Sequence, residues 1–274
     1  MQLSKEIGQS AYANALSKNI DGLAVTKTNL RRLLQSIDQV GWSTNEESGR
    51  VDRKAFVRYA TGSANIFSRR TSKQAETSAV SIFIDCSGSM NAIVQGSSRS
   101  RIDIARQITI HLTKILSQSR VPFAVTGFNT QHAKAGRNHE QSIGNAYAVS
   151  ETPCFIPIKT WKQSLQSAIP ALGYVAQFAE GGTPDYSAIF NAIDDLNQRP
   201  ESKRILFLIT DATGYHIEHI KHLQTLADKL GVLIVVIGIG TNDAIKCFTN
   251  AAAVNSAEDF ASAAFNNVLR AIRQ

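Results

Sequence analysis

The chain of 274 residues has room for one large domain, or for one domain with a smaller appendage. Hydrophobic residues make up 43% and charged residues 19%, as in globular proteins with a sizeable core. No apolar run approaches the roughly 18 residues that cross a bilayer, and the N-terminus lacks the apolar stretch of a signal peptide. The three cysteines are scattered and odd in number, which argues against a disulfide framework and favours a reducing cytoplasm.

The net charge of +7 is concentrated near the N-terminus. Residues 1–78 contain twelve Lys or Arg and seven acidic residues, so they carry +5 of the total and leave the remainder almost neutral. Aromatic residues do not alternate with the basic ones, as they do where nucleic-acid bases stack. The pattern favours a solvated basic segment, or a docking surface for an acidic partner, over nucleic-acid binding.

Residues 1–76 are predicted to form a helical, basic lead-in segment and not an independent domain. Apolar residues at helical spacing form a stripe that ends at Gly41. The residues of this stripe are Leu30, Leu33, Leu34, Ile37 and Val40.

Residues 77–274 show short apolar runs that alternate with helical patterns, which predicts an α/β domain. The expected strands are Ala79–Asp85, Val121–Phe128, Cys154–Ile158, Arg204–Thr210 and Val232–Gly238. The expected helices are Ile102–Leu116, Trp161–Phe178, Tyr186–Leu196, Ile217–Leu230 and Ala257–Arg273, and Asn129–Ser150 is expected to be a loop. Such an alternation predicts a parallel sheet with helices on both faces, because each crossover places its helix on a face.

Two carboxylates follow strands of this predicted sheet. Asp85 comes at the end of one strand and Asp211 directly after another. Ligands of doubly wound sheets gather outside the carboxyl ends of the strands, so both side chains are expected at the same edge. Between them in the chain, Gly181-Gly-Thr183-Pro forms a loop that presents a hydroxyl before a helix.

The residue types at this edge suit a hard divalent cation. Mg²⁺ prefers six oxygen ligands, and one or two carboxylates with hydroxyls and waters satisfy it. Asp85, Ser87 and Ser89 alternate along one turn, and Thr183 and Asp211 come from two other loops. We therefore predict a site for Mg²⁺ (or Mn²⁺) with a coordination position left open for a carboxylate from another molecule.

These motifs resemble the metal-ion-dependent adhesion site of the von Willebrand factor A family. Asp85-Cys-Ser87-Gly-Ser89, Gly-Gly-Thr183-Pro and Ile-Thr-Asp211 occur in the order and context of that family, over roughly residues 77–274. The resemblance implies a Rossmann-like fold, with a doubly wound, mostly parallel sheet flanked by helices. It also implies that the first three residues bind the metal directly, and that Thr183 and Asp211 bind it directly or through water.

A finer resemblance is to the T subunit of aerobic cobaltochelatase. It is carried by Gly49-Arg-Val-Asp, Asn65-Ile-Phe-Ser-Arg-Arg, Phe-Ile-Asp-Cys-Ser-Gly-Ser-Met90 and Val-Val-Ile-Gly-Ile-Gly240. In that family, this subunit works with a ring-forming AAA+ ATPase, and together they assist a large catalytic subunit that inserts cobalt in cobalamin biosynthesis. The family's long acidic region is absent from this sequence, and Ala212 replaces the glycine that usually follows the second Asp.

Other residues invite competing interpretations. Cys86 lies within the metal loop, but no histidine is placed to activate it, so we interpret it as a buried spacer. His216, His219 and His222 recur on one helix face, which favours a solvated or partner-facing surface and leaves a transition-metal site as the alternative. The sequence has no Gly-Lys-Ser/Thr phosphate loop, so the chain is not expected to be the ATPase itself.

The first functional hypothesis is a non-catalytic, Mg²⁺-dependent interaction subunit that couples an AAA+ ATPase to a larger client or chelatase subunit. An acidic residue of the partner would complete the metal shell, and basic residues 27–73 would supply a second contact. The second hypothesis is a metal-dependent phosphoester hydrolase with Asp185 or His216 as the base. The third is a nucleic-acid-binding accessory protein with salt-sensitive affinity.

Overall fold

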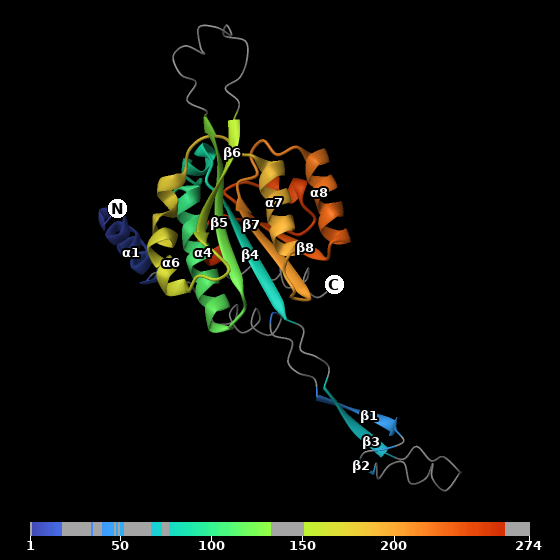
Figure 1. The fold of residues 1–274 in the computed structure, drawn as a ribbon. Helices are drawn as coiled ribbons and strands as arrows, with labels where there is room; N and C mark the ends of the chain where they lie inside the picture. The colour runs from blue at the N-terminus through green and yellow to red at the C-terminus, as the bar shows by residue number, and fades with distance from the viewer. Residues whose placement is uncertain are drawn as a thin grey trace, which may run out of the picture.

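The computed structural model describes residues 2–17, 34, 40–46, 48, 50–51, 67–72, 77–132 and 151–260. The main element of these residues is a six-stranded sheet with the order β6-β5-β4-β7-β8-β9 (Figure 1). Its strands are β4 (Ser78–Asp85), β5 (Phe123–His132), β6 (Glu151–Lys159), β7 (Lys203–Thr210), β8 (Val232–Ile239) and β9 (Ala251–Val254). Only β5 and β6 pair in antiparallel fashion within this sheet, which confirms the predicted mostly parallel α/β fold.

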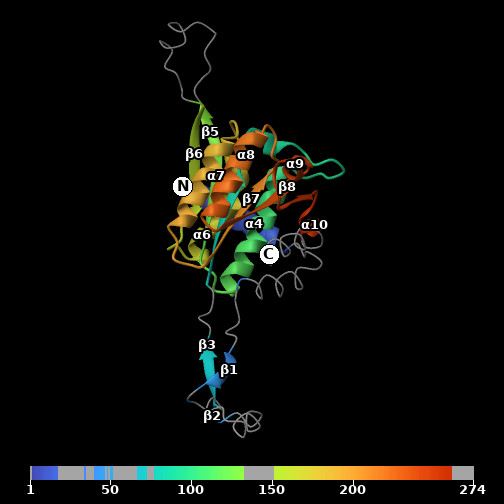
Figure 2. The ribbon, with the colours of Figure 1, turned by 90° about the vertical axis from the view of Figure 1, so that its right-hand side faces the viewer.

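Helices cover both faces of the sheet (Figures 1 and 2). One face carries α1 (Gln2–Ser17), α4 (Arg101–Gln118) and α6 (Leu165–Tyr174), and the other carries α7 (Asp185–Asn197) and α8 (Ile217–Lys229). Shorter helical segments are η2 (Gly88–Asn91), η4 (Val175–Phe178), α9 (Asp243–Cys247) and α10 (Ala257–Asp259). The two helical layers explain why the central strands are apolar along their whole length.

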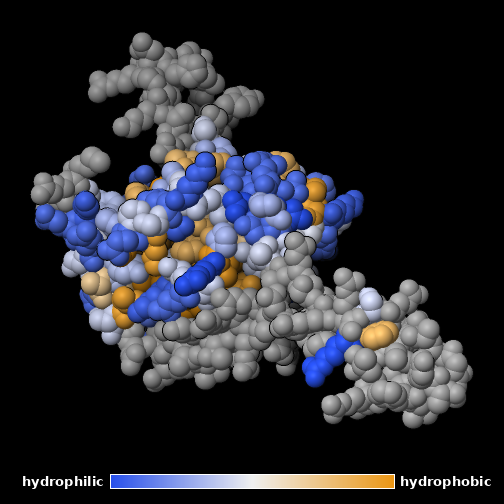
Figure 3. All heavy atoms as spheres, turned by 60° about the horizontal axis from the view of Figure 1, so that its bottom comes forward, coloured by the Kyte–Doolittle hydropathy of each residue, from blue (hydrophilic) through white to orange (hydrophobic). Residues whose placement is uncertain are grey.

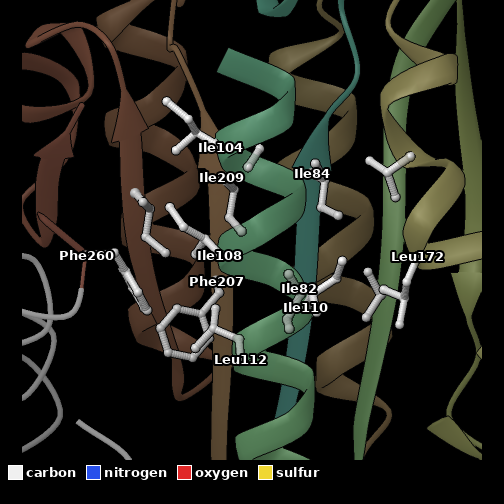
Figure 4. Packing of buried hydrophobic residues seen from close by; sticks show 14 of the residues in the cluster. Ile82, Ile84, Ile104, Ile108, Ile110, Leu112, Leu172, Phe207, Ile209 and Phe260 are labelled. Atoms are coloured by element: carbon white, nitrogen blue, oxygen red, sulfur yellow. The ribbon is translucent and has the colours of Figure 1, made fainter. Parts of the chain in front are cut away.

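The core is divided by the sheet into two clusters. Because successive strand residues point to opposite faces, β4 contributes Ile82 and Ile84 to the cluster around α4, and Phe83 to the cluster beneath α7 and α8. Helix α4 lies across its face with Ile104 and Ile108 turned towards the strands (Figure 4). Burying one such side chain contributes about 1.5–3 kcal/mol, so these layers hold the strand ends in place.

The visible surface of the described residues is mostly hydrophilic. Seen from below the view of Figure 1, blue side chains dominate, and hydrophobic ones gather in a smaller area between them (Figure 3). Across the described part of the chain, no helix combines the length and the apolar character that a membrane crossing requires.

The five predicted strands are all present, and most predicted helices agree within a few residues. The predicted loop Asn129–Ser150 is wrong at its start, because β5 continues to His132 and pairs there with β6. Residues 133–150 lie outside the described residues, as does most of the predicted helix Ala257–Arg273, of which α10 is the described part. Helix α9 and strand β9 were not predicted, since both are only four or five residues long.

The helical interpretation of residues 1–76 requires a correction. It holds for α1, but β1 (Val40–Glu46), β2 (Arg50–Val51) and β3 (Phe67–Ser72) form an antiparallel sheet of the order β1-β3-β2. Val40, expected to close a helical stripe, instead starts β1 and pairs with Ser72. Pairing between segments so far apart in the chain overrides local periodicity. Of the stripe's other residues, the structure describes only Leu34, which is helical and buried.

Helix α1 packs closely against α6 at two glycines. A Cβ atom built on Gly173 would lie 1.8 Å from the Gly8 carbonyl oxygen, and one built on Gly8 would lie 2.1 Å from the Pro170 carbonyl oxygen. Only residues without a side chain allow the two backbones to approach so closely. Tyr12 and Ala15 are buried in the same core cluster as α4, so α1 packs as a part of the α/β unit.

Candidate metal centre

The carboxyl ends of β4 and β7 bring two carboxylates to one edge of the sheet. The strands are adjacent and parallel, with Ile84 opposite Ile209, so Asp85 and Asp211 emerge side by side. From β4 the chain adds β5 and β6 on one side and β7, β8 and β9 on the other, so the strand order reverses here. Both carboxylates are fully buried, at 0% exposure.

Asp85 is held by hydrogen bonds from two neighbours. Its Oδ1 accepts a hydrogen bond from the Ser87 backbone N at 2.9 Å, and its Oδ2 accepts one from the Thr210 hydroxyl at 2.6 Å. Burial raises the pKa of Asp85 from 3.8 to about 6, against the lowering effect of these hydrogen bonds. The negative charge of Asp211 adds a smaller increase to this pKa. A nearby cation would lower this pKa again, because it stabilises the ionised carboxylate.

The loop after Asp85 places two hydroxyls together. The Ser87 and Ser89 Oγ atoms lie 3.1 Å apart, and Ser87 is buried. The loop is anchored on both sides, because Cys86 N donates to the Phe128 carbonyl at 2.8 Å and Gly88 N donates to the Gly181 carbonyl at 2.9 Å.

Cys86 itself points into the core and is fully buried. Burial raises the pKa of its thiol far above the usual range, and the neighbouring Asp85 charge raises it further. A thiol in this state is a poor nucleophile. The interpretation of Cys86 as a buried spacer agrees with this environment.

A second loop, Gly181–Thr183, is fitted against the first. Gly181 has φ +71°, and a Cβ atom there would lie 2.0 Å from the Thr130 carbonyl oxygen. Gly182 N donates to the Thr130 hydroxyl at 2.7 Å, and Thr130 N donates to the Gly182 carbonyl at 3.0 Å. Thr183, which is partly exposed, lies two residues before α7 and two residues after Gly181, whose carbonyl accepts the hydrogen bond from Gly88.

Asp211 is engaged by an arginine that sequence reasoning missed. Its Oδ2 accepts a hydrogen bond from Arg101 Nη1 at 2.6 Å, and its Oδ1 accepts one from Thr213 N at 3.0 Å. Arg101 is the first residue of α4 and lies 110 positions from Asp211 in the chain. No local pattern connects two residues so far apart.

The residue after Asp211 adopts an unusual backbone conformation. Ala212 has φ +53°, in the left-handed region that costs a residue with a Cβ roughly 1–2 kcal/mol. Its N–H donates to the Thr210 hydroxyl at 2.8 Å, the same hydroxyl that donates to Asp85. The turn therefore ties the backbone beside Asp211 to the Asp85 carboxylate, and it accounts for a preference for glycine at this position.

The histidines of α8 form an aromatic surface. His219 and His222 are exposed and contact the Tyr186 ring, with centroid distances of 5.8 and 6.3 Å. The His216 backbone N donates to Asp185 at 3.3 Å. In the described part of the chain, no three His, Cys, Asp or Glu side chains are grouped to hold a metal ion, so the transition-metal alternative has no geometric support.

The residues at the strand edge fit a hard divalent cation. Two buried carboxylates, close enough for their charges to interact, face two neighbouring hydroxyls, and Thr183 follows on the adjoining loop. All of these side chains offer oxygen atoms, the ligand that Mg²⁺ and Mn²⁺ prefer.

The raised pKa of Asp85 predicts how stability depends on pH in a chelator. Because the folded-state pKa exceeds the ordinary value, this group's contribution is fully present below pH 3.8 and is lost as pH rises through about 6. Between about pH 4 and about pH 7, the free energy of unfolding of the wild type should therefore fall by up to about 3 kcal/mol relative to that of Asp85→Asn. Urea unfolding across this range measures the difference, and parallel curves for the two proteins would contradict it.

The described topology defines a class of protein: a von Willebrand factor A-type domain with a doubly wound sheet and a serine-rich loop after its central strand. The family model described as "Cobalamin biosynthesis protein CobT VWA domain" matches residues 66–274. The chain belongs to this family. Among curated proteins, no significant match is found.

Solved structures with similar folds come from diverse sources. The PilB minor pilin from Streptococcus sanguinis aligns with a TM-score of 0.50 and 16% identity, over 75% of this chain and 64% of the pilin. Proximal thread matrix protein 1 from the mussel byssus, solved with a zinc-occupied MIDAS motif, aligns with a TM-score of 0.49 and 18% identity, over 71% of this chain and 46% of that protein. BatB from Bacteroides thetaiotaomicron aligns with a TM-score of 0.46 and 16% identity, over 72% of this chain and 99% of BatB. At such identities, the pilin comparison shows a shared fold alone.

Proposed function

We propose that this chain is a non-catalytic subunit that binds a protein partner through a divalent metal ion, Mg²⁺ or Mn²⁺. Five residues would hold the ion: Asp85, Ser87, Ser89, Thr183 and Asp211. The observation that carries the proposal is the pair of buried carboxylates at the carboxyl ends of β4 and β7, where the strand order reverses and two hydroxyls lie close by. When bound, the ion supplies a positive centre to which a carboxylate of the partner coordinates.

The chain's own groups perform separate tasks in this proposal. Asp85 offsets charge from inside the core, and its hydrogen bonds to Thr210 and Ser87 fix the direction of its oxygens. The hydroxyls contribute oxygen without adding negative charge, so the site remains attractive to an acidic side chain. The anchors of the Ser87–Ser89 loop keep it in place before the ion arrives, which lowers the entropy lost on binding.

The family suggests the assembly in which the subunit acts. We propose that it couples an AAA+ ATPase to a larger client, in the manner of the cobaltochelatase T subunit, with cobalt insertion in cobalamin biosynthesis as the process served. Residues 77–274 would form the metal-dependent domain. The basic segment 27–73, which the structure describes only in part, would supply a second contact. The free cysteines fit a protein of the reducing cytoplasm.

The hydrolase alternative receives less support from the geometry. It requires a general base beside the metal, and Asp185 was one of two candidates. The Asp185 carboxylate accepts hydrogen bonds from the backbone N–H groups of Tyr186 at 2.7 Å and His216 at 3.3 Å. Both bonds connect Asp185 to residues outside the five candidate ligands, so neither supports a role for it as a base beside the metal.

Affinity capture from host lysate tests the proposal. The baits are the wild type and Asp85→Ala, each in Mg²⁺ and in chelator, with Asp228→Ala as a control that removes an exposed carboxylate of α8. An AAA+ ATPase should be retained by the wild type and by the control in Mg²⁺ alone, as read by mass spectrometry. Capture of the same ATPase by Asp85→Ala, or in chelator, would overturn the metal-dependent coupling.

A further inference from the structure

Arg101 reaches the proposed metal site from outside the five candidate ligands. Its Nη1 lies 2.6 Å from Asp211 Oδ2 and 3.5 Å from the Ser89 carbonyl oxygen. The guanidinium therefore spans two of the loops that carry candidate ligands. Its side chain is 18% exposed and that of Asp211 is 0% exposed, so the pair is screened little by solvent.

The fold provides a slot for this arginine. A Cβ atom on Gly240, at the end of β8, would lie 3.2 Å from Arg101 Nε and 3.5 Å from its Cγ, so a glycine there leaves room for the side chain. The adjoining Thr241 hydroxyl donates to the Asp211 carbonyl at 2.7 Å. Gly240 and Thr241 thus have structural roles beside Arg101 and Asp211.

The position of Arg101 opposes an ordinary preference of helices. As the first residue of α4, it puts a cation where the helix dipole disfavours one. Its backbone N donates to the Ala92 carbonyl at 3.0 Å, which fixes the start of the helix. The ion pair with Asp211 offsets the unfavourable position and gives the arginine its direction.

A divalent ion at this edge would meet Arg101 at close range. The guanidinium compensates one of the two buried negative charges, and a metal bound by Asp211 would share that carboxylate with it. Two cations on one buried carboxylate repel each other strongly, since the interior screens charge weakly. The same excess positive charge attracts an incoming carboxylate.

We propose that Arg101 sets the specificity of the site by weakening the binding of the metal alone and strengthening the binding of metal and acidic partner together. The inference rests on the proposed metal-dependent interaction. By linkage, a carboxylate that relieves the repulsion raises metal affinity by the same factor as the metal raises carboxylate affinity. Arg101 thereby makes occupancy of the site conditional on an acidic partner.

Titration with Mn²⁺ tests this role, using Arg101→Gln, Arg101→Lys and the wild type. The control is Arg120→Gln, which removes the same charge at an exposed position beyond the opposite end of α4 from Arg101. We expect Arg101→Gln to bind Mn²⁺ about tenfold more tightly, and Arg101→Lys and Arg120→Gln to remain within about twofold of wild type. With sodium acetate as the carboxylate probe, Mn²⁺ affinity should rise in the wild type and rise less in Arg101→Gln.

Each outcome distinguishes the inference from the function on which it rests. Unchanged or weaker Mn²⁺ binding by Arg101→Gln would overturn the role of Arg101 and leave the metal site standing. Absence of Mn²⁺ binding in the wild type and in every variant would overturn the proposed function itself. Circular dichroism checks the folds, and Arg101→Met, which keeps an unbranched chain in the slot, replaces Arg101→Gln if that variant does not fold.

Discussion

Asp85→Ala is expected to lower the affinity for Mg²⁺ or Mn²⁺ by at least about 100-fold. The change removes one of two buried carboxylates, and even residues that only support metal ligands contribute 10–100-fold in other sites. Isothermal titration with Mn²⁺ measures the effect. The fold should survive the substitution, because burial of an ionised Asp85 disfavours the folded state at neutral pH, as its raised pKa indicates.

The matched control for this result is Asp228→Ala. It removes one carboxylate from the exposed surface of α8 and should leave Mn²⁺ affinity within about twofold of wild type, since exposed charges at a distance are screened. Thermal unfolding of each protein in chelator separates loss of metal binding from loss of the fold. Equal Mn²⁺ affinity in Asp85→Ala and wild type would show that the ion, if bound, lies elsewhere.

Gly181→Ala is expected to weaken metal binding without touching any candidate ligand. Its new Cβ atom would lie 2.0 Å from the Thr130 carbonyl oxygen, so the loop or β5 must move. Gly181 also accepts the hydrogen bond from Gly88 N, so both the Ser87–Ser89 loop and Thr183 would shift with it. Misplacement of ligands on this scale should lower Mn²⁺ affinity by at least about tenfold, in the range seen when ligand supports are lost.

Gly96→Ala provides the comparison for Gly181→Ala. Gly96 has φ +79°, close to the +71° of Gly181, but no atom lies within 4 Å of a Cβ built there. Both variants therefore carry the same kind of backbone strain, of roughly 1–2 kcal/mol, and only Gly181→Ala also carries the steric clash. Similar Mn²⁺ affinities in the two variants would assign the effect to strain and contradict a role for the close contact with Thr130.

The unit that positions the site extends beyond the family match. The match begins at residue 66, whereas α1 packs against α6 through Gly8 and Gly173 and contributes Tyr12 to the core. The buried Leu34 adds a further contact, since its carbonyl accepts a hydrogen bond from the Ser78 hydroxyl at 3.0 Å, at the start of β4. N-terminal residues therefore stabilise the strand that ends in Asp85.

The sequence by itself determined the α/β class, the central strands and the edge at which Asp85 and Asp211 meet. These follow from local signals, because buried parallel strands are apolar throughout and the carboxyl ends of parallel strands share one edge. The spacing of Ser87 and Ser89 after Asp85 also sufficed to place their hydroxyls on one loop, 3.1 Å apart in the fold.

Only the tertiary structure decided the features that depend on distant partners. The strands β1 and β3 form by pairing across more than twenty residues, and residues 129–132 join β5 because β6 lies beside them. The ion pair between Arg101 and Asp211 likewise joins residues 110 positions apart. Local periodicity carries no information about such contacts, because their free energy arises only when the chain closes the loop between them.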